Sequence, residues 1–292
     1  MKYRVRHETI YEYADPVDLA SHMIHLHPRA LPHQRVLSAL VTADPLASRV
    51  STLRDYFGND VQLLFVDRPH DRFAVLLEAK VDVCFPPAPK ASDTPAWEQV
   101  AAFARRGGGP GWDAAEFSFA SEMAPADPGA GAYAAVSFPA GRAVLRGLLD
   151  LTARINTDFT FRAGVTTIHT PVERVLAQRA GVCQDFTHLM IAGLRALGLP
   201  ARYVSGYLRT RPPPGQVARR GEDQSHAWVG CWLGPEHGWI DLDPTNNLIV
   251  SEEHVVLAWG RDFGDVSPVR GVILGGGHHS VNVRVTLEPA AS

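Results

Sequence analysis

The sequence predicts an α+β fold, in which an N-terminal antiparallel β-sandwich precedes a second domain that mixes helices and strands. Short runs of strand-forming residues, several of them alternating between apolar and polar, occupy much of the first 85 residues. Apolar residues then follow a helical spacing in two later segments, 142–156 and 183–197, and three strand-like runs follow the second segment. This order of elements is typical of α+β proteins.

The composition fits a globular protein with either one large domain or two of ordinary size, and we expect two. The chain has 292 residues, of which 46% are hydrophobic, and this is enough to bury two cores of ordinary size. The net charge is −3 and no Lys/Arg run exceeds short pairs such as Arg105-Arg106, which argues against nucleic acid as a partner. No apolar stretch is long enough to span a membrane, and residues 1–8 lack the apolar core of a secretory signal.

The cysteines indicate a reducing compartment. Cys84, Cys183 and Cys231 are odd in number, far apart and in no CxxC pair, so the sequence predicts neither a disulfide framework nor a cysteine zinc site. We therefore expect a cytoplasmic protein with no metal and no other cofactor. Cys84 and Cys231 are expected to be small buried side chains.

The N-terminal domain is predicted to span residues 1–85. Its expected strands are 3–13, 36–43, 61–67 and 73–85, with turn residues between them. Asp15-Pro16 is expected to end the first strand. Residues 86–141 are rich in proline, glycine and alanine, which predicts a connector with local helix and not a core element.

The second domain is predicted to span residues 142–292. After the helix at 142–156, Thr170-Pro171 has the residues of a helix start, an N-cap threonine followed by proline. The expected strands are 201–208, 225–233 and 239–243, and the last apolar runs, near Val255 and over 281–287, are grouped with this domain. The loop Arg209–Gln224 is interpreted either as a flap over the site or as a solvated loop.

A single cysteine stands at the start of the second predicted helix. Gly181 breaks the chain before Cys183, and Gly198 with Pro200 supplies the stop signal after the helix. Cys183 is therefore expected in the first turn, where unpaired N–H groups and the helix dipole lower the pKa of a thiol from its usual value of about 8.5. Asp185 lies in the same turn, and its negative charge raises the thiol pKa, so the two effects oppose each other.

A base and an orienting carboxylate are available downstream. His226 and Asp243 lie on consecutive predicted strands, whose side chains alternate between the two faces of the sheet. If Trp232 pairs with Trp239, His226 lies diagonal to Asp243 and within reach of a hydrogen bond. A slip of one residue would put the two groups on opposite faces. Asp243 is therefore the expected carboxylate, with Asp241 in reserve.

Cys183, His226 and Asp243 together fit nucleophilic catalysis at a carbonyl carbon. Cys183 would attack as a thiolate, His226 would take and return the proton, and Asp243 would hold the imidazole tautomer. The backbone N–H of Cys183 is a natural donor to the oxyanion.

Four further residues are candidates for substrate contact. Gln184 adjoins the nucleophile and is a candidate second oxyanion donor. Trp228 and Trp239 either line a substrate cleft or build a core between strands. Asp241 shares a strand face with Trp239. His188, about one turn beyond the cysteine, is expected to pack or hydrogen-bond within its helix and not to act as a base.

Three separated blocks resemble the bacterial transglutaminase-like superfamily. They are Gly181-Val182-Cys183-Gln184-Asp185-Phe186, Ser225-His226-Ala227-Trp228-Val229 and Asp243-Pro244-Thr245-Asn246, in the order of that family. The run Tyr3-Arg4-Val5-Arg6-His7 is similar to the β-rich region that precedes the family's core. The resemblance implies a papain-like core, with the cysteine on a central helix packed against an antiparallel sheet, and it assigns Cys183, His226 and Asp243 as a catalytic triad. The chain departs from the commonest pattern at Gly230, where many relatives carry an acidic residue.

The residues and the resemblance together predict a thiol-dependent acyl-transfer enzyme that acts on an amide. Members of the superfamily are similar to cysteine peptidases or amidases and to protein cross-linking enzymes, so either water or an amine is a possible acyl acceptor. We favour hydrolysis, since water is always present and no amine-binding carboxylate cluster is recognisable. The expected partner is a peptide or protein with an amide or glutamine group, and the oligomeric state stays open. The rival interpretation is a non-catalytic binding or scaffold module, against which the intact triad argues.

Overall fold

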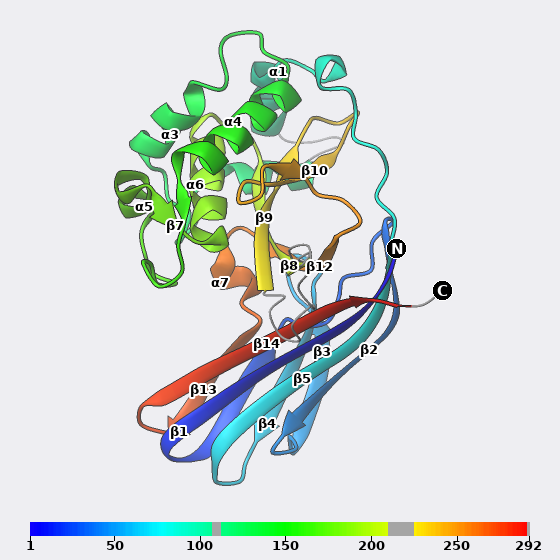
Figure 1. Cartoon of the computed structure of the whole chain (residues 1–292), viewed down its shortest axis with the longest axis vertical. Helices are drawn as coiled ribbons and strands as arrows, with labels where there is room; N and C mark the ends of the chain where they lie inside the picture. Colours follow the sequence, from blue (N-terminus) through cyan, green and yellow to red (C-terminus); the bar gives the residue numbers. More distant parts are fainter. Residues whose placement is uncertain (107–111, 210–224, 291–292) are drawn as a thin grey trace, which may run out of the picture.

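The computed structural model describes residues 1–106, 112–209 and 225–290. It confirms the α+β class, because long antiparallel strands form a sheet at one end of the molecule and helices pack on a second, smaller sheet at the other end (Figure 1). Residues 210–224, which make up nearly all of the loop interpreted above as a flap or a solvated loop, lie outside the described residues.

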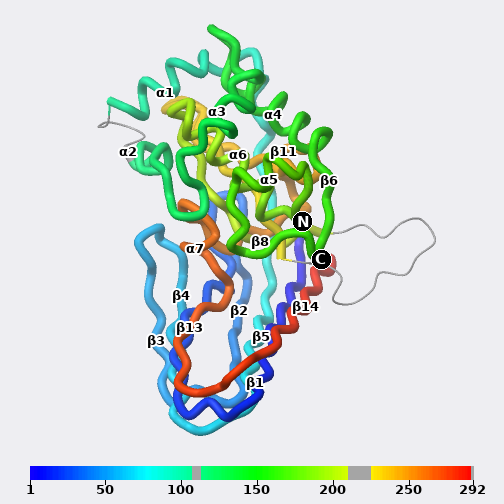
Figure 2. The backbone as a smooth tube through the Cα atoms, turned by 90° about the vertical axis from the view of Figure 1, so that its left-hand side faces the viewer, coloured from blue at the N-terminus to red at the C-terminus, as the bar shows by residue number. Residues whose placement is uncertain are grey.

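The first sheet is built around one long strand, β1 (Lys2–Ile24). The other strands of this sheet are β2 (Gln34–Asp44), β3 (Arg49–Arg54), β4 (Asp60–Val66), β5 (His70–Val83), β13 (Val269–Gly275) and β14 (His279–Pro289). The first half of β1 pairs with β5 and β14, whereas its second half pairs with β4 and β13. The sheet therefore curls into two layers that share β1, as the turned view in Figure 2 shows.

β1 continues past Asp15-Pro16, where the sequence predicted its end. The pairing of β1 with β5 shifts register between Glu12 and Val17. Proline has no N–H to donate to a ladder, and here it falls at an irregularity where no regular pairing is required. The proline therefore marks a bend within one strand, at the place where β1 changes neighbours.

The two C-terminal strands belong to the first sheet, whereas the sequence analysis grouped them with the second domain. β14 pairs with β1 continuously, from Tyr3 opposite Pro289 to Tyr13 opposite His279. An alternating pattern predicts a strand but carries no information about which distant strand it will pair with. β3 was not expected at all, because its six residues are exposed and lack a buried face.

The proline- and glycine-rich middle segment contributes helices to the core. These elements are η1 (Ala91–Asp93), α1 (Trp97–Arg106), α2 (Trp112–Ala115), η2 (Glu116–Ser118) and α3 (Pro128–Ala135). α3 packs closely on α6 (Cys183–Ala196), because a Cβ added at Gly131 would lie 2.9 Å from the Cβ of Ala196, and one added at Gly193 would lie 2.8 Å from the Cβ of Ala134. The small residues that suggested a loop instead permit two helices to approach each other.

The second sheet carries the site. Its strands run in the order β11 (Leu248–Ile249), β10 (Trp239–Asp243), β9 (Ser225–Trp232), β8 (Ala201–Leu208) and β12 (His254–Gly260). The helices beside it are α4 (Val144–Asp158), α5 (Val172–Gln178), α6 and α7 (Phe263–Val266), and a short parallel pair joins β6 (Thr160–Phe161) to β7 (Ala180–Gly181). Every residue of α6 from Asp185 to Arg195 is buried, so α6 is the central helix. Trp232 pairs with Trp239, and the predicted register of β9 and β10 is confirmed.

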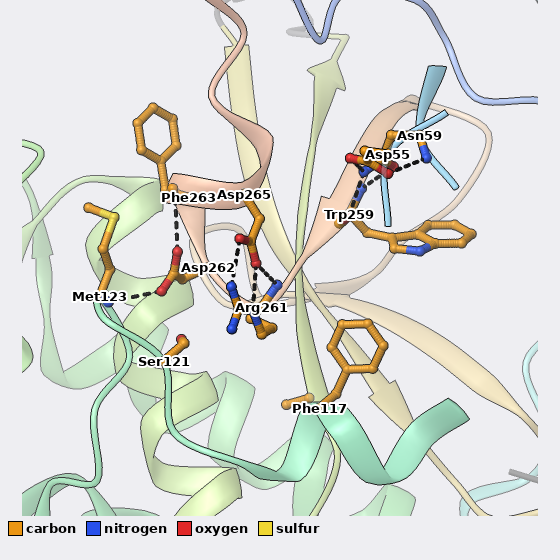
Figure 3. A network of polar contacts seen from close by, with 12 residues as sticks. Asp55, Asn59, Phe117, Ser121, Met123, Trp259, Arg261, Asp262, Phe263 and Asp265 are labelled. Atoms are coloured by element: carbon orange, nitrogen blue, oxygen red, sulfur yellow. Dashed lines mark hydrogen bonds and ion pairs between the residues drawn. The ribbon is translucent and has the colours of Figure 1, made fainter. Parts of the chain in front are cut away.

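Side-chain amides from the first sheet region complete the backbone bonding of β12. The Gln34 amide donates to the carbonyl of Val256 at 2.7 Å, and its oxygen accepts from the Val256 N–H at 2.8 Å. Asn59 makes the same exchange with the backbone of Trp259, at 2.9 and 3.0 Å, as the close view in Figure 3 shows. These bonds hold the second sheet on the first. None of the described helices is long and apolar enough to cross a membrane.

Candidate active site

Cys183 is the first residue of α6, as the sequence predicted. Val182 before it is extended, and its backbone N–H donates to the carboxylate of Asp185 at 2.7 Å. The same Asp185 oxygen accepts a hydrogen bond from the hydroxyl of Thr166, also at 2.7 Å. The carboxylate therefore fixes the entry of the chain into the helix and so the position of the thiol.

Contacts of Asp185 leave no room for a side chain at Gly181, two residues before the cysteine. A Cβ added at Gly181 would lie 2.7 Å from Oδ2 and 2.8 Å from Cβ of Asp185, closer than real Cβ contacts come. Burial raises the pKa of Asp185, and the hydrogen bonds from Val182 and Thr166 oppose this rise. The observed contacts of Asp185 give it a positioning role, in addition to the charge effect on the thiol that the sequence predicts.

His226 and Asp243 meet at the open end of β9 and β10. The imidazole Nε2 lies 2.7 Å from Oδ2 of Asp243, and the Asp243 side chain is fully buried. Cys183 lies close enough to His226 to raise the pKa of the imidazole. Because Nε2 faces the carboxylate, Nδ1 is the ring nitrogen left for the thiol. The structure thus brings together the three residues that the sequence singled out from three different elements.

The electrostatics of this group favour a charged imidazole. Burial by itself lowers the pKa of His226, but the hydrogen bond to Asp243 and the charges of Asp243 and Cys183 outweigh burial and raise the pKa to about 10. Burial raises the pKa of Asp243, but the hydrogen bonds from His226 and Asn246 and the nearby His254 outweigh burial and hold this pKa well below its usual value. At neutral pH the histidine is a proton donor held beside a carboxylate.

Three residues that contact Asp243, namely Thr245, Asn246 and His254, were missed by the sequence analysis. Asn246 donates its side-chain amide to Oδ2 of Asp243 at 2.6 Å, and the backbone N–H groups of Thr245 and Asn246 donate to Oδ1 at 2.9 and 3.2 Å. His254 on β12 places Nε2 at 3.6 Å from the same Oδ2. Asn246 lies in the Asp243-Pro244-Thr245-Asn246 block, so its place in the turn after Asp243 could have identified it as a partner of that carboxylate. Nothing in the sequence pointed to His254.

The predicted substrate contacts occupy different environments. Gln184 donates its amide to the carbonyl of Ile168 at 3.1 Å. Trp228 is fully buried and donates its indole N–H to Asp241 at 2.9 Å, so it belongs to the core. Trp239 and Asp241 line a cavity on the sheet.

The other histidine and cysteines near the sequence motifs do not join this group. His188 is buried and its Nε2 accepts the backbone N–H of Phe263 at 3.2 Å, and burial lowers its pKa to about 4. Cys231 is buried, as expected. Cys84 is exposed, and the prediction that it is buried was wrong. It directly follows Val83, the last residue of β5, and falls on the exposed face of the alternation that buries Val81 and Val83.

Comparisons with known proteins identify the family of the chain. Residues 3–82 match the family model of the bacterial transglutaminase-like N-terminal region, and residues 141–244 match that of the transglutaminase-like superfamily. Over 292 residues the chain is 42% identical to an uncharacterized protein of Mycobacterium tuberculosis, covering 99% of this chain and 93% of that protein. The chain belongs to the transglutaminase-like superfamily.

Other proteins are similar over all or part of the chain. An uncharacterized protein of Mycobacterium leprae is 29% identical over 287 residues, covering 97% of both chains. A crystal structure named "Putative Cysteine Protease" from Cytophaga hutchinsonii has a TM-score of 0.74 at 22% identity, covering 100% of this chain and 91% of that one, and supports the papain-like core. A protein-glutamine gamma-glutamyltransferase of Pseudomonas aeruginosa is 41% identical over 68 residues, 23% of this chain and 10% of that protein.

Proposed function

We propose that this protein is a cysteine-dependent acyl-transfer enzyme that cleaves amide bonds, with Cys183 as nucleophile, His226 as acid and base, and Asp243 as the group that orients His226. The observation that carries the proposal is the pairing of His226 with Asp243 at 2.7 Å, beside a cysteine in the first turn of a buried helix. A cysteine, a hydrogen-bonded histidine and an orienting carboxylate are the parts that thiol catalysis requires.

The first half of the reaction would form an acyl-thioester. The sulfur of Cys183 attacks the amide carbonyl carbon, and the N–H groups at the start of α6 stabilise the oxyanion. The C–N bond then breaks as the protonated His226 gives its Nδ1 proton to the leaving amine. The amine departs, and the acyl group stays on the sulfur.

The second half would transfer the acyl group to water. Neutral His226 takes a proton from the incoming water, whose oxygen bonds to the acyl carbon. The C–S bond breaks and the thiolate returns beside the imidazolium, with a carboxylic acid as product. Asp243 keeps its charge throughout and holds Nε2 of the ring.

A second candidate is transfer to a primary amine, as in a transglutaminase. It is favoured by the local similarity to a protein-glutamine gamma-glutamyltransferase, which is 41% identical over 68 residues. The chemistry up to the acyl-thioester would be the same, and only the acceptor would differ.

The test is to incubate the full chain with a library of glutamine-containing peptides, with and without a primary amine, and to identify the products by mass. Shortened peptides would indicate a peptidase, glutamate with ammonia an amidase, and amine adducts with ammonia a transglutaminase. Every product should disappear in Cys183→Ala and persist in Cys84→Ala, the matched control for an exposed cysteine. Equal product from Cys183→Ala would place the chemistry elsewhere.

A further inference from the structure

A cavity lies on the side of the second sheet that faces away from α6. Its volume is about 500 Å³, and its lining comes from β8, β10 and β12 and from the segments 31–33 and 85–89. Arg202 on β8 lines it, whereas the next residue, Tyr203, faces α6 and places its ring 5.1 Å from that of His188. Neither Cys183 nor His226 nor Asp243 is among the residues that line this cavity.

Arg202 is a buried charge whose Nε has no hydrogen-bond acceptor in the part of the chain that the structure describes. The residue is only 8% exposed. The carboxylate of Asp241 lies 4.0 Å from Nη2, beyond hydrogen-bond distance. Burial lowers the pKa of Arg202 to about 10, opposed by Asp241 and Asp113, so the side chain is still charged at neutral pH. A buried charge is normally paired and hydrogen-bonded.

The guanidinium of Arg202 is held in place by aromatic rings. Its central carbon lies 3.7 Å from the ring centre of Trp259 and 4.3 Å from that of Trp239, within the range of cation–π contact. The backbone of Trp259 is fixed in turn by its two hydrogen bonds with Asn59 (Figure 3). The guanidinium is therefore pre-positioned.

Arg202, Gly230 and Asp241 form a row across β8, β9 and β10. Gly230 pairs with Arg202 on one side and with Asp241 on the other. A Cβ at Gly230 would lie 2.7 Å from Nε of Arg202 and 3.0 Å from Oδ1 of Asp241, so the glycine makes room for the guanidinium. The result is a positive and a negative group side by side at the cavity wall, close to each other but not hydrogen-bonded.

We propose that this cavity binds a free α-amino acid with an apolar side chain. The carboxylate and ammonium groups of an α-amino acid are separated by a single carbon, and this spacing suits the pair of Arg202 and Asp241. The planar fork of an arginine matches a carboxylate, which would give Arg202 the acceptors it lacks. Asp113, on the cavity lining, adds negative charge for the ammonium group. Phe85 and the prolines of segment 86–89 form an apolar wall for the side chain, and the cavity size is within the range of small-molecule sites.

The probes are L-phenylalanine, L-leucine, L-methionine and L-tryptophan, titrated into the full chain by calorimetry up to about 10 mM. Each analogue that lacks one charged group, 3-phenylpropanoate or 2-phenylethylamine, should bind at least roughly tenfold more weakly than L-phenylalanine. The dipeptide glycyl-L-phenylalanine tests whether the ligand is a free amino acid or a short peptide, since both carry an ammonium and a carboxylate group. The dipeptide should bind more weakly because its two charges lie farther apart. Stronger binding of the dipeptide than of every amino acid would overturn the free amino acid as the ligand.

Substitutions test whether amino acid binding depends on the row of Arg202, Gly230 and Asp241. Arg202→Met should abolish binding, and Gly230→Ala, which keeps the charge but displaces the guanidinium, should weaken it. Arg35→Met, at an arginine whose side chain is 72% exposed on β2, is the matched control and should bind as the unchanged protein does. Binding should also be unaffected in Cys183→Ala, so the result is independent of the proposed reaction. Absence of saturable binding for all four amino acids, or equal binding of L-phenylalanine and its two analogues, would overturn the proposal.

Discussion

Replacing Asp243 by asparagine should lower the pKa of His226. The rise in the pKa of His226 from 6.5 to about 10 corresponds to roughly 5 kcal/mol of preference for the protonated ring, at about 1.4 kcal/mol per pKa unit. Burial acts in the opposite direction, and among the influences that raise the pKa the hydrogen bond to Asp243 is the largest. The side chain of His226 is only 10% exposed, so solvent screens this interaction little. In Asp243→Asn the pKa of His226 should therefore fall by on the order of 2 units.

The assay is a pH titration of the His226 imidazole by NMR on protein labelled in histidine, with the signal assigned through His226→Gln. Asp55→Asn is the matched control, because Asp55 lies 3.4 Å from a different histidine, His25, and its loss should leave His226 unchanged. An unchanged pKa of His226 in Asp243→Asn would refute the assignment of Asp243 as the group that holds the imidazole charged.

The same substitution has a consequence for stability. Because the pKa of His226 is raised in the folded state, its contribution to the free energy of unfolding is complete below 6.5 and is lost as the pH rises through about 10. Urea denaturation should therefore show a decline in stability over this pH window. The decline should be smaller in Asp243→Asn than in the unchanged protein, and an equal decline in both would contradict the linkage.

Three further predictions concern the parts around this pair. Iodoacetamide should modify Cys183 faster than Cys84, although Cys84 is the more exposed of the two, and mass spectrometry showing equal rates would speak against an activated thiol. Gly181→Ala should lower the free energy of unfolding by about 1–3 kcal/mol, because its Cβ would lie 2.7 Å from the Asp185 carboxylate; an unchanged urea midpoint would contradict the steric role of Gly181. Asn246→Ala removes a 2.6 Å hydrogen bond that helps to hold the pKa of Asp243 low, so on acidification the protein should lose stability at a higher pH. An acid titration followed by circular dichroism would detect this shift, and an unshifted acid transition would count against the role of Asn246.

The local elements near the site were predictable because their signals are local. The start of α6 at Cys183 follows from the glycine break and the helical spacing after it. The register of β9 and β10, with Trp232 opposite Trp239, was one of those that the sequence allows, and the structure adopts it. Sequence spacing therefore showed that His226 and Asp243 come together if this register forms.

The long-range features were not predictable from spacing. The pairing of β14 with β1 joins the two ends of the chain, and no pattern within either strand specifies the other. Likewise, His254 reaches Asp243 only because β12 returns to pair with β8. The row of Arg202, Gly230 and Asp241 is created by the pairing of three strands. Only the structure therefore explains why the chain has a glycine at position 230, where many members of the family carry an acidic residue: the glycine makes room for the guanidinium of Arg202.

The central claim is that Cys183 carries the acyl group. The most direct measurement is to mix the full chain with peptides that it cleaves or modifies, quench the reaction in acid, and search tryptic fragments by mass spectrometry for an acyl adduct on Cys183. The adduct should form in the unchanged protein, be released by hydroxylamine, and be absent in Cys183→Ala and in His226→Ala. Product formation at the unchanged rate in Cys183→Ala, with no adduct on any fragment, would contradict the account.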